Sequence, residues 1–325
     1  MSYNILMIVN PKAGKAKISK LTPEIIRNLQ KQNYKVITRY TGKDKNAKNI
    51  VKDYYEPYDI VLVCGGDGTL NEVVQGLYER NKKTFIAFIP VGTTNDFARS
   101  LDLSFDKFLV SKFINQYEAS KVDMGKYNNH IFNYAASFGV FSHTSYNTPI
   151  EMKNRFGRFA YVIMGIKELF NIKTHKVKIA TADRNIKDEF IYGSITNTKN
   201  IGGFKVFRKK DVEMNDGEFE VLLIKKTKNF FSTLFLTLKI LMGFLDDKNV
   251  IYFKTSSVDF EFDRGTTWSL DGEKTDRVKE VSIINLKQYN TFIIPPEELE
   301  ENKEEDKKDN DDWDLDTYNI IYKDL

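Results

Sequence analysis

The stretch VLVCGGDGTLNEVVQG, residues 61–76, puts three glycines between an apolar run and a helical pattern. A chain that leaves a parallel strand and turns at once into a helix needs backbone angles that side chains resist, and Gly65, Gly66 and Gly68 supply them. The missing side chains also let backbone N–H groups approach a ligand at the positive end of the helix. Phosphate suits such a corner best, although a plain turn would explain the same residues.

Two further corners of this kind follow apolar runs. NPKAGK begins at residue 10, after NILMIV, and PVGTTNDFARS covers residues 90–100, after TFIAFIP. Strand ends that lead into helices share one edge of a parallel sheet, which is where α/β proteins bind ligands. Three glycine-bearing loops at one edge therefore favour a phosphate site. None has the G-x-G-x-x-G or P-loop spacing, which argues against a Rossmann dinucleotide site and a P-loop nucleoside triphosphatase.

The pattern of the 325 residues changes once along the chain. Apolar runs alternate with helical patterns over residues 1–126, which predicts a doubly wound, largely parallel α/β domain. Residues 127–295 alternate like antiparallel strands, with helical patterns near 156–170 and 230–245, and predict a β-sandwich domain. The pattern allows the end of this domain to return to the first. The acidic segment 296–325 is predicted to be mostly disordered.

Charge and composition narrow the class of protein. Residues 297–325 hold thirteen acidic and four basic side chains, so the overall charge of +4 leaves +13 on residues 1–296, which favours anionic partners. The single cysteine, Cys64, and the absence of a recognisable secretory signal predict a cytoplasmic protein. The longest apolar run, 230–245, is shorter than the roughly 20 residues of a bilayer span and predicts a buried or surface-docking helix.

Four motifs in order resemble the diacylglycerol kinase catalytic family: NP-x-x-G at 10–14, GGDGTLNEV at 65–73, PVGTTNDFAR at 90–99 and LDGE at 270–273. The resemblance covers about residues 3–295. It implies an α/β ATP-binding domain, a β-sandwich lipid-substrate domain, and transfer of the γ-phosphate of ATP to a lipid hydroxyl with Mg²⁺. Diacylglycerol is the expected acceptor. Alternatives are phosphatidylglycerol or a sphingoid base, then NAD kinase-like activity, then a lipid-binding protein without catalysis.

The resemblance also assigns site residues. It places ATP contacts at the three corners and at a threonine after the second strand: Asn10, Pro11, Lys12, Ala13, Gly14, Thr41, Gly66, Asp67, Gly68, Thr69, Leu70, Asn71, Glu72 and Thr93. Ala13 replaces the serine of many relatives, which removes one hydroxyl contact. Asp67 would organise Mg²⁺–ATP, and a second, structural Mg²⁺ would bind at Glu213, Asp216 and Glu218.

Two carboxylates in SLDGEK complete the predicted site. A lipid hydroxyl is a poor nucleophile, so a carboxylate that accepts its proton assists phosphoryl transfer. Glu273 matches the family's proton acceptor, and Asp271 would join the polar network towards Mg²⁺. On spacing alone, an ordinary Asp-Gly hairpin turn explains these residues as well. The predicted partners are a membrane lipid substrate, a peripheral membrane surface and a second copy of the chain, and no nucleic acid.

Overall fold

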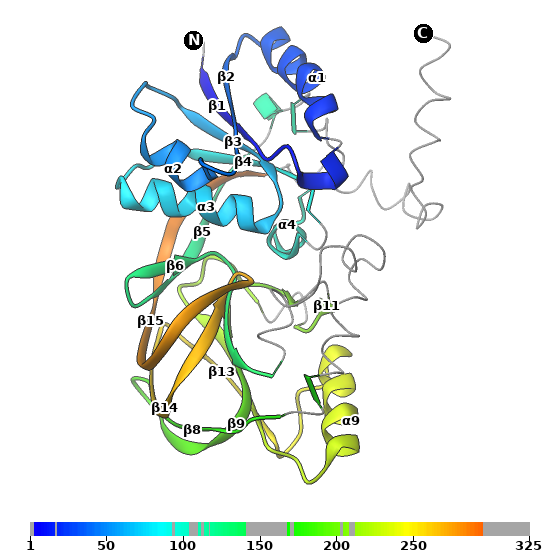
Figure 1. Cartoon of the computed structure of the whole chain (residues 1–325), viewed down its shortest axis with the longest axis vertical. Coiled ribbons are helices and arrows are strands. Elements are labelled where there is room, and N and C mark those ends of the chain that lie inside the picture. Colours follow the sequence, from blue (N-terminus) through cyan, green and yellow to red (C-terminus); the bar gives the residue numbers. More distant parts are fainter. Residues whose placement is uncertain are drawn as a thin grey trace, which may run out of the picture.

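The computed structural model describes residues 3–16, 18–92, 95–103, 110–111, 114–116, 118–140, 168–169, 172–201, 204–207 and 212–294. Thr93, most of the helical pattern near 156–170, and the tail 296–325 lie outside these ranges. The chain forms a half in which helices flank a parallel sheet and a half built mainly of long strands, arranged along the longest axis of the molecule (Figure 1).

The first half is a parallel sheet with helices on both faces. Its strands pair in the order β4-β3-β1-β2. They are β1 (Asn4–Val9), β2 (Lys35–Tyr40), β3 (Ile60–Gly65) and β4 (Phe85–Pro90). The helices are α1 (Ile18–Lys31), α2 (Ala47–Lys52), α3 (Asp67–Glu79) and α4 (Asp96–Ser100), with 3-10 turns η1 (Ala13–Ala16) and η2 (Ile114–Gln116).

The apolar runs of the sequence become strands that are buried on both faces. Along β1, Ile5 and Met7 join the core cluster on the α1 side of the sheet. The alternate residues Leu6 and Ile8 join the cluster formed with α2 and α3. Because side chains alternate across a strand, a run without polar residues requires cover on both faces. The predicted doubly wound α/β half is confirmed.

The second half is rich in strands. They are β5 (Glu118–Tyr127), β6 (His130–Phe132), β7 (Ala135–Gly139), β8 (His175–Ala180), β9 (Asn185–Thr196), β10 (Asn200–Ile201), β11 (Phe204–Lys205), β12 (Phe219–Lys225), β13 (Val250–Thr255), β14 (Ser257–Leu270) and β15 (Glu273–Ile294). Helix α9 covers Phe230–Leu241. Both β9 and β14 pair with β7 at one end and with β8 at the other, so the ladder closes into a ring around Trp268 and Phe138. The β-rich character is confirmed, whereas the two-sheet sandwich stays a prediction.

Strand β15 joins the two halves. Its first part pairs antiparallel with β14, and it runs alongside β5 from Tyr127 to Glu118. Its end lies parallel to β4, where Thr291 is opposite Phe85. Among the described residues, one ladder of 13 strands therefore runs through both halves. The boundary predicted at residue 126 lies one residue before the last residue of β5, Tyr127, and stays a prediction.

The glycine corners of β3 and β4 pack against each other. A Cβ atom on Gly92 would lie 2.8 Å from the Cα of Gly66 and 2.6 Å from Oδ1 of Asn95. The Val91 N–H donates to the Gly65 carbonyl at 2.8 Å, and a bond of 2.9 Å from Asn10 N–H to the Cys64 carbonyl attaches the first corner. Close backbone approach is thus one physical reason for glycine here.

Replacing Gly92 by alanine should destabilise the protein. The added methyl group would have to displace backbone of the neighbouring corner and the buried Asn95, which typically costs about 1–3 kcal/mol. The matched control is Gly42→Ala, because a Cβ atom at Gly42 meets nothing within 4 Å. Urea denaturation of both variants checks this, and equal free energies of unfolding would contradict the inferred contact.

Candidate active site

Helix α3 begins inside the glycine corner. The apolar pattern predicts a start near Leu70, but the first helical residue is Asp67. Aspartate and glycine are weak helix formers, so the sequence pattern does not indicate that this first turn is helical. Gly66 occupies the N-cap position without a side-chain hydrogen bond to the helix end. The first N–H groups of a 13-residue helix are therefore presented to the corner without a side-chain cap.

The structure brings the first corner onto α3. The Asn10 side-chain amide donates to the Thr69 hydroxyl at 3.0 Å, and its carbonyl oxygen accepts from the Lys12 N–H at 3.1 Å. Gly14 has a φ of 59°, a left-handed value that glycine tolerates best, and lies against the Val91 carbonyl. Pro11 and Ala13 lie between Asn10 and Gly14 in the sequence and are partly exposed. After β2, the Thr41 N–H donates to the Val9 carbonyl at 2.9 Å.

The two carboxylate oxygens of Asp67 differ in their bonding. Its Oδ2 accepts from the Asp96 N–H at 3.1 Å, while its buried Oδ1 has no hydrogen-bond partner among the described residues. Burial, with the charges of Asp96 and Asp271, raises the pKa of Asp67 to about 7. An unpaired buried carboxylate oxygen fits a hard cation, and Mg²⁺ commonly takes one protein carboxylate together with substrate phosphates.

The LDGE motif forms a tight hairpin turn between β14 and β15. Asp271 and Gly272 have φ values of 47° and 90°, as a two-residue type I′ turn requires. The Asp271 carboxylate accepts three backbone N–H bonds, from Asn133 at 2.6 Å and from Tyr134 and Ala135 at 3.0 Å each. Burial raises its pKa to about 6, although these N–H groups oppose the shift. Asp271 therefore anchors the turn to the segment between β6 and β7.

Glu273 follows this turn and lies beside the glycine corner. A Cβ atom on Gly68 would lie 3.9 Å from the Glu273 Oε1. The Glu273 side chain is exposed, yet loss of hydration raises its pKa, and the carboxylate of Glu72 adds to the shift. Glu72 is engaged elsewhere, because its Oε2 accepts the Ala47 N–H at 2.8 Å. Of these two carboxylates, Glu273 is the accessible one.

Leu70 and Asn71 lie at the same helix end but face other partners. Leu70 is buried in the core beneath α3, so a contact with ATP would have to come from its backbone. The side-chain Oδ1 of Asn71 accepts from the Asn133 side-chain amide at 3.3 Å. Since the Asn133 N–H also bonds to Asp271, this asparagine links α3 to the LDGE turn.

Known proteins resemble this chain over most of its length. A family model for the diacylglycerol kinase catalytic domain matches residues 4–127. A diacylglycerol kinase of Staphylococcus epidermidis is 31% identical over 301 residues, covering 91% of this chain and 95% of that protein. The Bacillus subtilis diacylglycerol kinase is 27% identical over 297 residues, covering 91% and 97%.

The chain belongs to the diacylglycerol kinase family. Two solved structures agree in fold. A diacylglycerol kinase from Bacillus anthracis has a TM-score of 0.74 at 24% identity, covering 91% of this chain and 98% of that one. An NAD kinase from Archaeoglobus fulgidus in complex with ATP has a TM-score of 0.52 at 10% identity, covering 92% and 96%. The resemblance predicted from the four motifs is confirmed.

The PVGTTNDFARS corner predicts Asn95 as the cap of the following helix, and Asn95 does occupy the N-cap position of α4, although its side chain bonds within the corner. The Asn95 side chain pairs with both the N–H and the carbonyl of Gly92, each at 2.9 Å. Two polar residues that sequence reasoning missed, Asn133 and Asp123, also connect distant segments of this family member. Asn133 links α3 to the hairpin turn. Buried Asp123 accepts the N–H groups of Gly217 and Gln288, both at 2.6 Å. For Asp123, the available signal was a carboxylate between the apolar Val122 and Met124 in the strand pattern KVDMGKY.

The residues predicted for a second Mg²⁺ do not form a cage of carboxylates. The Asp216 Oδ2 lies 3.1 Å from the Lys254 ammonium, and its Oδ1 accepts the Glu218 N–H at 2.9 Å. Glu213 and Glu218 are exposed. In the described part of the chain, no group of three or more His, Cys, Asp or Glu side chains could hold a metal ion. These side chains as placed do not fit the ion, and the second site stays a prediction.

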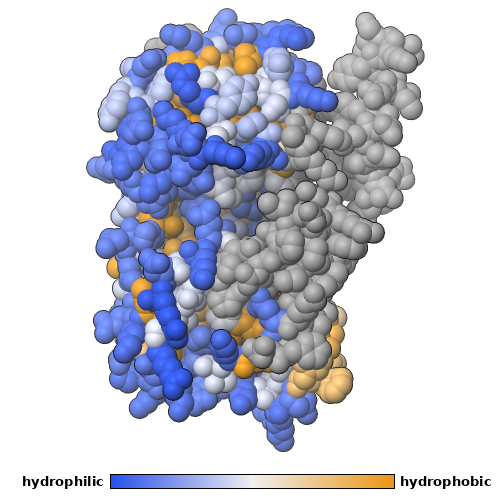
Figure 2. Space-filling model, in the orientation of Figure 1, coloured by the Kyte–Doolittle hydropathy of each residue, from blue (hydrophilic) through white to orange (hydrophobic). Residues whose placement is uncertain are grey.

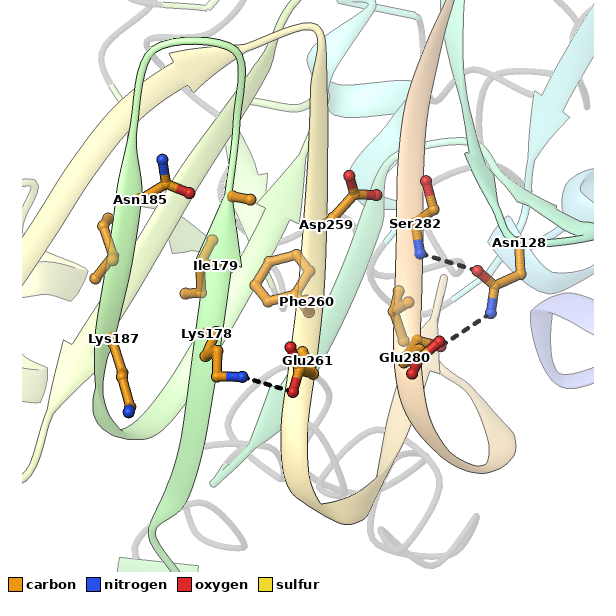
Figure 3. Close-up of a pocket in the computed structure, with 13 residues that line it drawn as sticks. Asn128, Lys178, Ile179, Asn185, Lys187, Asp259, Phe260, Glu261, Glu280 and Ser282 are labelled. Atoms are coloured by element: carbon orange, nitrogen blue, oxygen red, sulfur yellow. Dashed lines mark hydrogen bonds and ion pairs between the residues drawn. The ribbon is translucent and has the colours of Figure 1, made fainter.

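An open hollow of about 770 Å³ lies elsewhere, on the outer face of the second half (Figure 3). Its lining comes from β8, β9, β14, β15 and the turn between β5 and β6, and includes none of the predicted site residues. The polar side chains point outward from the sheet, and Lys178 pairs with Glu261 at 2.8 Å. This surface is solvated and separate from the glycine corners.

The raised pKa of Asp67 predicts a pH-dependent gain in stability for Asp67→Asn. In the unfolded chain this carboxyl ionises near pH 4, so the folded protein holds an extra proton between about pH 4 and pH 7 and loses stability as the pH rises through that window. Without divalent cations, the variant should be more stable than the wild type by roughly 4 kcal/mol at pH 8, because three pKa units correspond to about 1.4 kcal/mol each. The gain should vanish near pH 4.

Chemical denaturation across this pH range measures the difference. Asp276→Asn is the control, because Asp276 is exposed on β15. Parallel stability curves for the wild type and Asp67→Asn would contradict the inferred burial of charge.

Proposed function

We propose that the chain transfers the γ-phosphate of ATP to the hydroxyl of diacylglycerol and so forms phosphatidic acid. The observation that carries the proposal is the position of Glu273 against Gly68. An accessible carboxylate from the second half meets the uncapped start of α3 in the first half. The names of the similar proteins, and the fold shared with an NAD kinase in complex with ATP, support this assignment.

Each residue has a chemical role in this proposal. The N–H groups at the start of α3 would bind ATP phosphates, with the corners around Gly14 and Gly92 forming the walls. Asp67 would hold Mg²⁺ through its unpaired oxygen, and the ion would offset the negative charge of the phosphates. Glu273 would accept the proton of the lipid hydroxyl as the oxygen–phosphorus bond forms. Asp271 would keep Glu273 in position through its three backbone bonds.

The organisation proposed for the chain follows from these roles. Residues 1–126 would serve as the ATP-binding domain, and 127–295 as a β-sandwich domain for the lipid. The charge of +13 on residues 1–296 supports peripheral binding to an anionic membrane, and a homodimer is a further proposal. Occupation of the second Mg²⁺ site would require Asp216 to release Lys254.

A lipid panel tests the substrate. Labelled ATP is incubated with the purified chain and, separately, with diacylglycerol, phosphatidylglycerol, a sphingoid base or NAD, and the product is identified by mass. We expect phosphatidic acid as the main product. Phosphorylated NAD as the product would indicate NAD kinase activity instead. The absence of a product with every acceptor would favour a lipid-binding protein without catalysis.

Replacing the proposed base isolates the chemical step. Glu273→Gln keeps the shape of the side chain but cannot accept a proton, so kcat should fall roughly 100-fold or more while ATP binding is kept. Glu280→Gln, the same change at an exposed residue of the same strand, serves as the control and should leave kcat unchanged. Equal turnover of the two variants would remove Glu273 from the mechanism.

A further inference from the structure

Helix α9 carries an exposed apolar stripe that the proposed reaction does not use. Phe231, Phe235, Leu238 and Met242 follow one another at spacings of four, three and four residues, which places them on one side of the helix. Their side chains are 77%, 63%, 47% and 64% exposed. The stripe coincides with the orange surface at the lower right of Figure 2, where Figure 1 places α9.

The concentration of these side chains distinguishes them from ordinary exposed residues. In the described part of the chain, ten large hydrophobic side chains are exposed, and five of them fall between Phe231 and Phe244. Scattered exposed hydrophobic residues need no explanation, but contiguous ones mark interaction sites. The α9 stripe is therefore a candidate docking surface.

The opposite side of α9 is already packed. Thr233, Leu236 and Ile240 are buried, and the last two belong to the core cluster that includes Ile191 and Leu222 of the β-rich half. A surface helix normally has one apolar and one polar side. Because α9 is apolar on both, packing inside the protein does not account for the outer stripe.

Basic residues border the stripe and indicate what covers it. Four lysines and two aspartates lie between residues 226 and 248. Lys226, Lys228 and Lys248 are exposed, and the Lys239 ammonium lies 5.5 Å from the Phe235 ring centre. In a two-fold symmetric dimer joined through this stripe, the lysines of one chain would face the same lysines of the other, and their charges would repel. An anionic lipid surface satisfies both the apolar stripe and the lysines.

We propose that the stripe Phe231, Phe235, Leu238 and Met242 enters the boundary between headgroups and acyl chains of an anionic bilayer. No described helix is long and apolar enough to cross a membrane, so α9 would lie in the surface plane. The preference for a bilayer over a protein partner rests on the proposed lipid kinase function. Docking by α9 would hold the second half, proposed to accept the lipid, against its source.

Vesicle co-sedimentation with the full chain tests this surface. The wild type should bind vesicles containing phosphatidylglycerol better than vesicles of phosphatidylcholine alone. Phe231→Gln/Phe235→Gln should lower partitioning into the anionic vesicles by roughly tenfold or more, because two large apolar side chains no longer leave water. Tyr55→Gln is the control, since Tyr55 is 82% exposed in the other half. Equal binding of the wild type and the double variant would overturn the proposal.

A gain of signal provides a second readout that does not depend on the double variant. In Phe231→Trp, the indole should show emission at shorter wavelength when anionic vesicles are added. Unchanged emission would overturn the proposal. So would sedimentation showing that the double variant separates a wild-type dimer while vesicle binding is unchanged, because the stripe would then join two copies of the chain.

These measurements do not require turnover. Absence of kinase activity would therefore count against the proposed function and not against the docking surface. The double variant should also phosphorylate short-chain diacylglycerol dispersed in water as fast as the wild type, because α9 is separate from the glycine corners. A loss of that activity would overturn a role confined to docking.

Discussion

The hydrogen-bonded continuity of β15 is the constraint on which the site depends. This strand begins at Glu273, pairs with β14 and β5, and ends parallel to β4 beside Phe85. The carboxyl end of β4 leads directly to the corner at Gly92. One ladder therefore connects the accessible carboxylate to the sheet that carries the glycine corners. A hinge between the halves would have to break this ladder or bend β15 at the irregularity between Leu286 and Asn290.

The site combines satisfied and unsatisfied carboxylates, and the difference separates their roles. Asp271 accepts three backbone N–H groups and is used in holding the hairpin turn. Asp67 has one buried oxygen that bonds to none of the residues the structure describes, and Glu273 is accessible. Buried polar groups are normally paired, so an unpaired one in a native site needs a physical explanation, and a bound ion is one such explanation. The same desolvation raises the pKa of both Asp67 and Glu273.

Most of what the sequence predicted correctly has a local cause. Glycines at strand ends and unbroken apolar runs predicted the corners and the α/β half, because these signals depend on neighbouring residues. The LDGE turn was also readable, since Asp-Gly is a common type I′ pair. The sequence did not predict the roles of Asn133 and Asp123, because each forms hydrogen bonds with a segment that is distant in the sequence. The helical pattern predicts a start of α3 near Leu70, three residues too late, because Asp67 and Gly68 are weak helix formers.

The sequence by itself determined the family and the list of candidate residues, because the four motifs have fixed residue types and order. The tertiary structure alone decided which of those residues lie together. It placed Glu273 beside Gly68, about two hundred residues away in the sequence. It also used the Asp271 carboxylate to accept backbone N–H groups and paired Asp216 with Lys254. It also decided that one side of α9 packs while the other is exposed. An apolar run shows only that burying the segment is favourable. The packing of distant strands determines which face of the segment is buried and which face stays exposed to water.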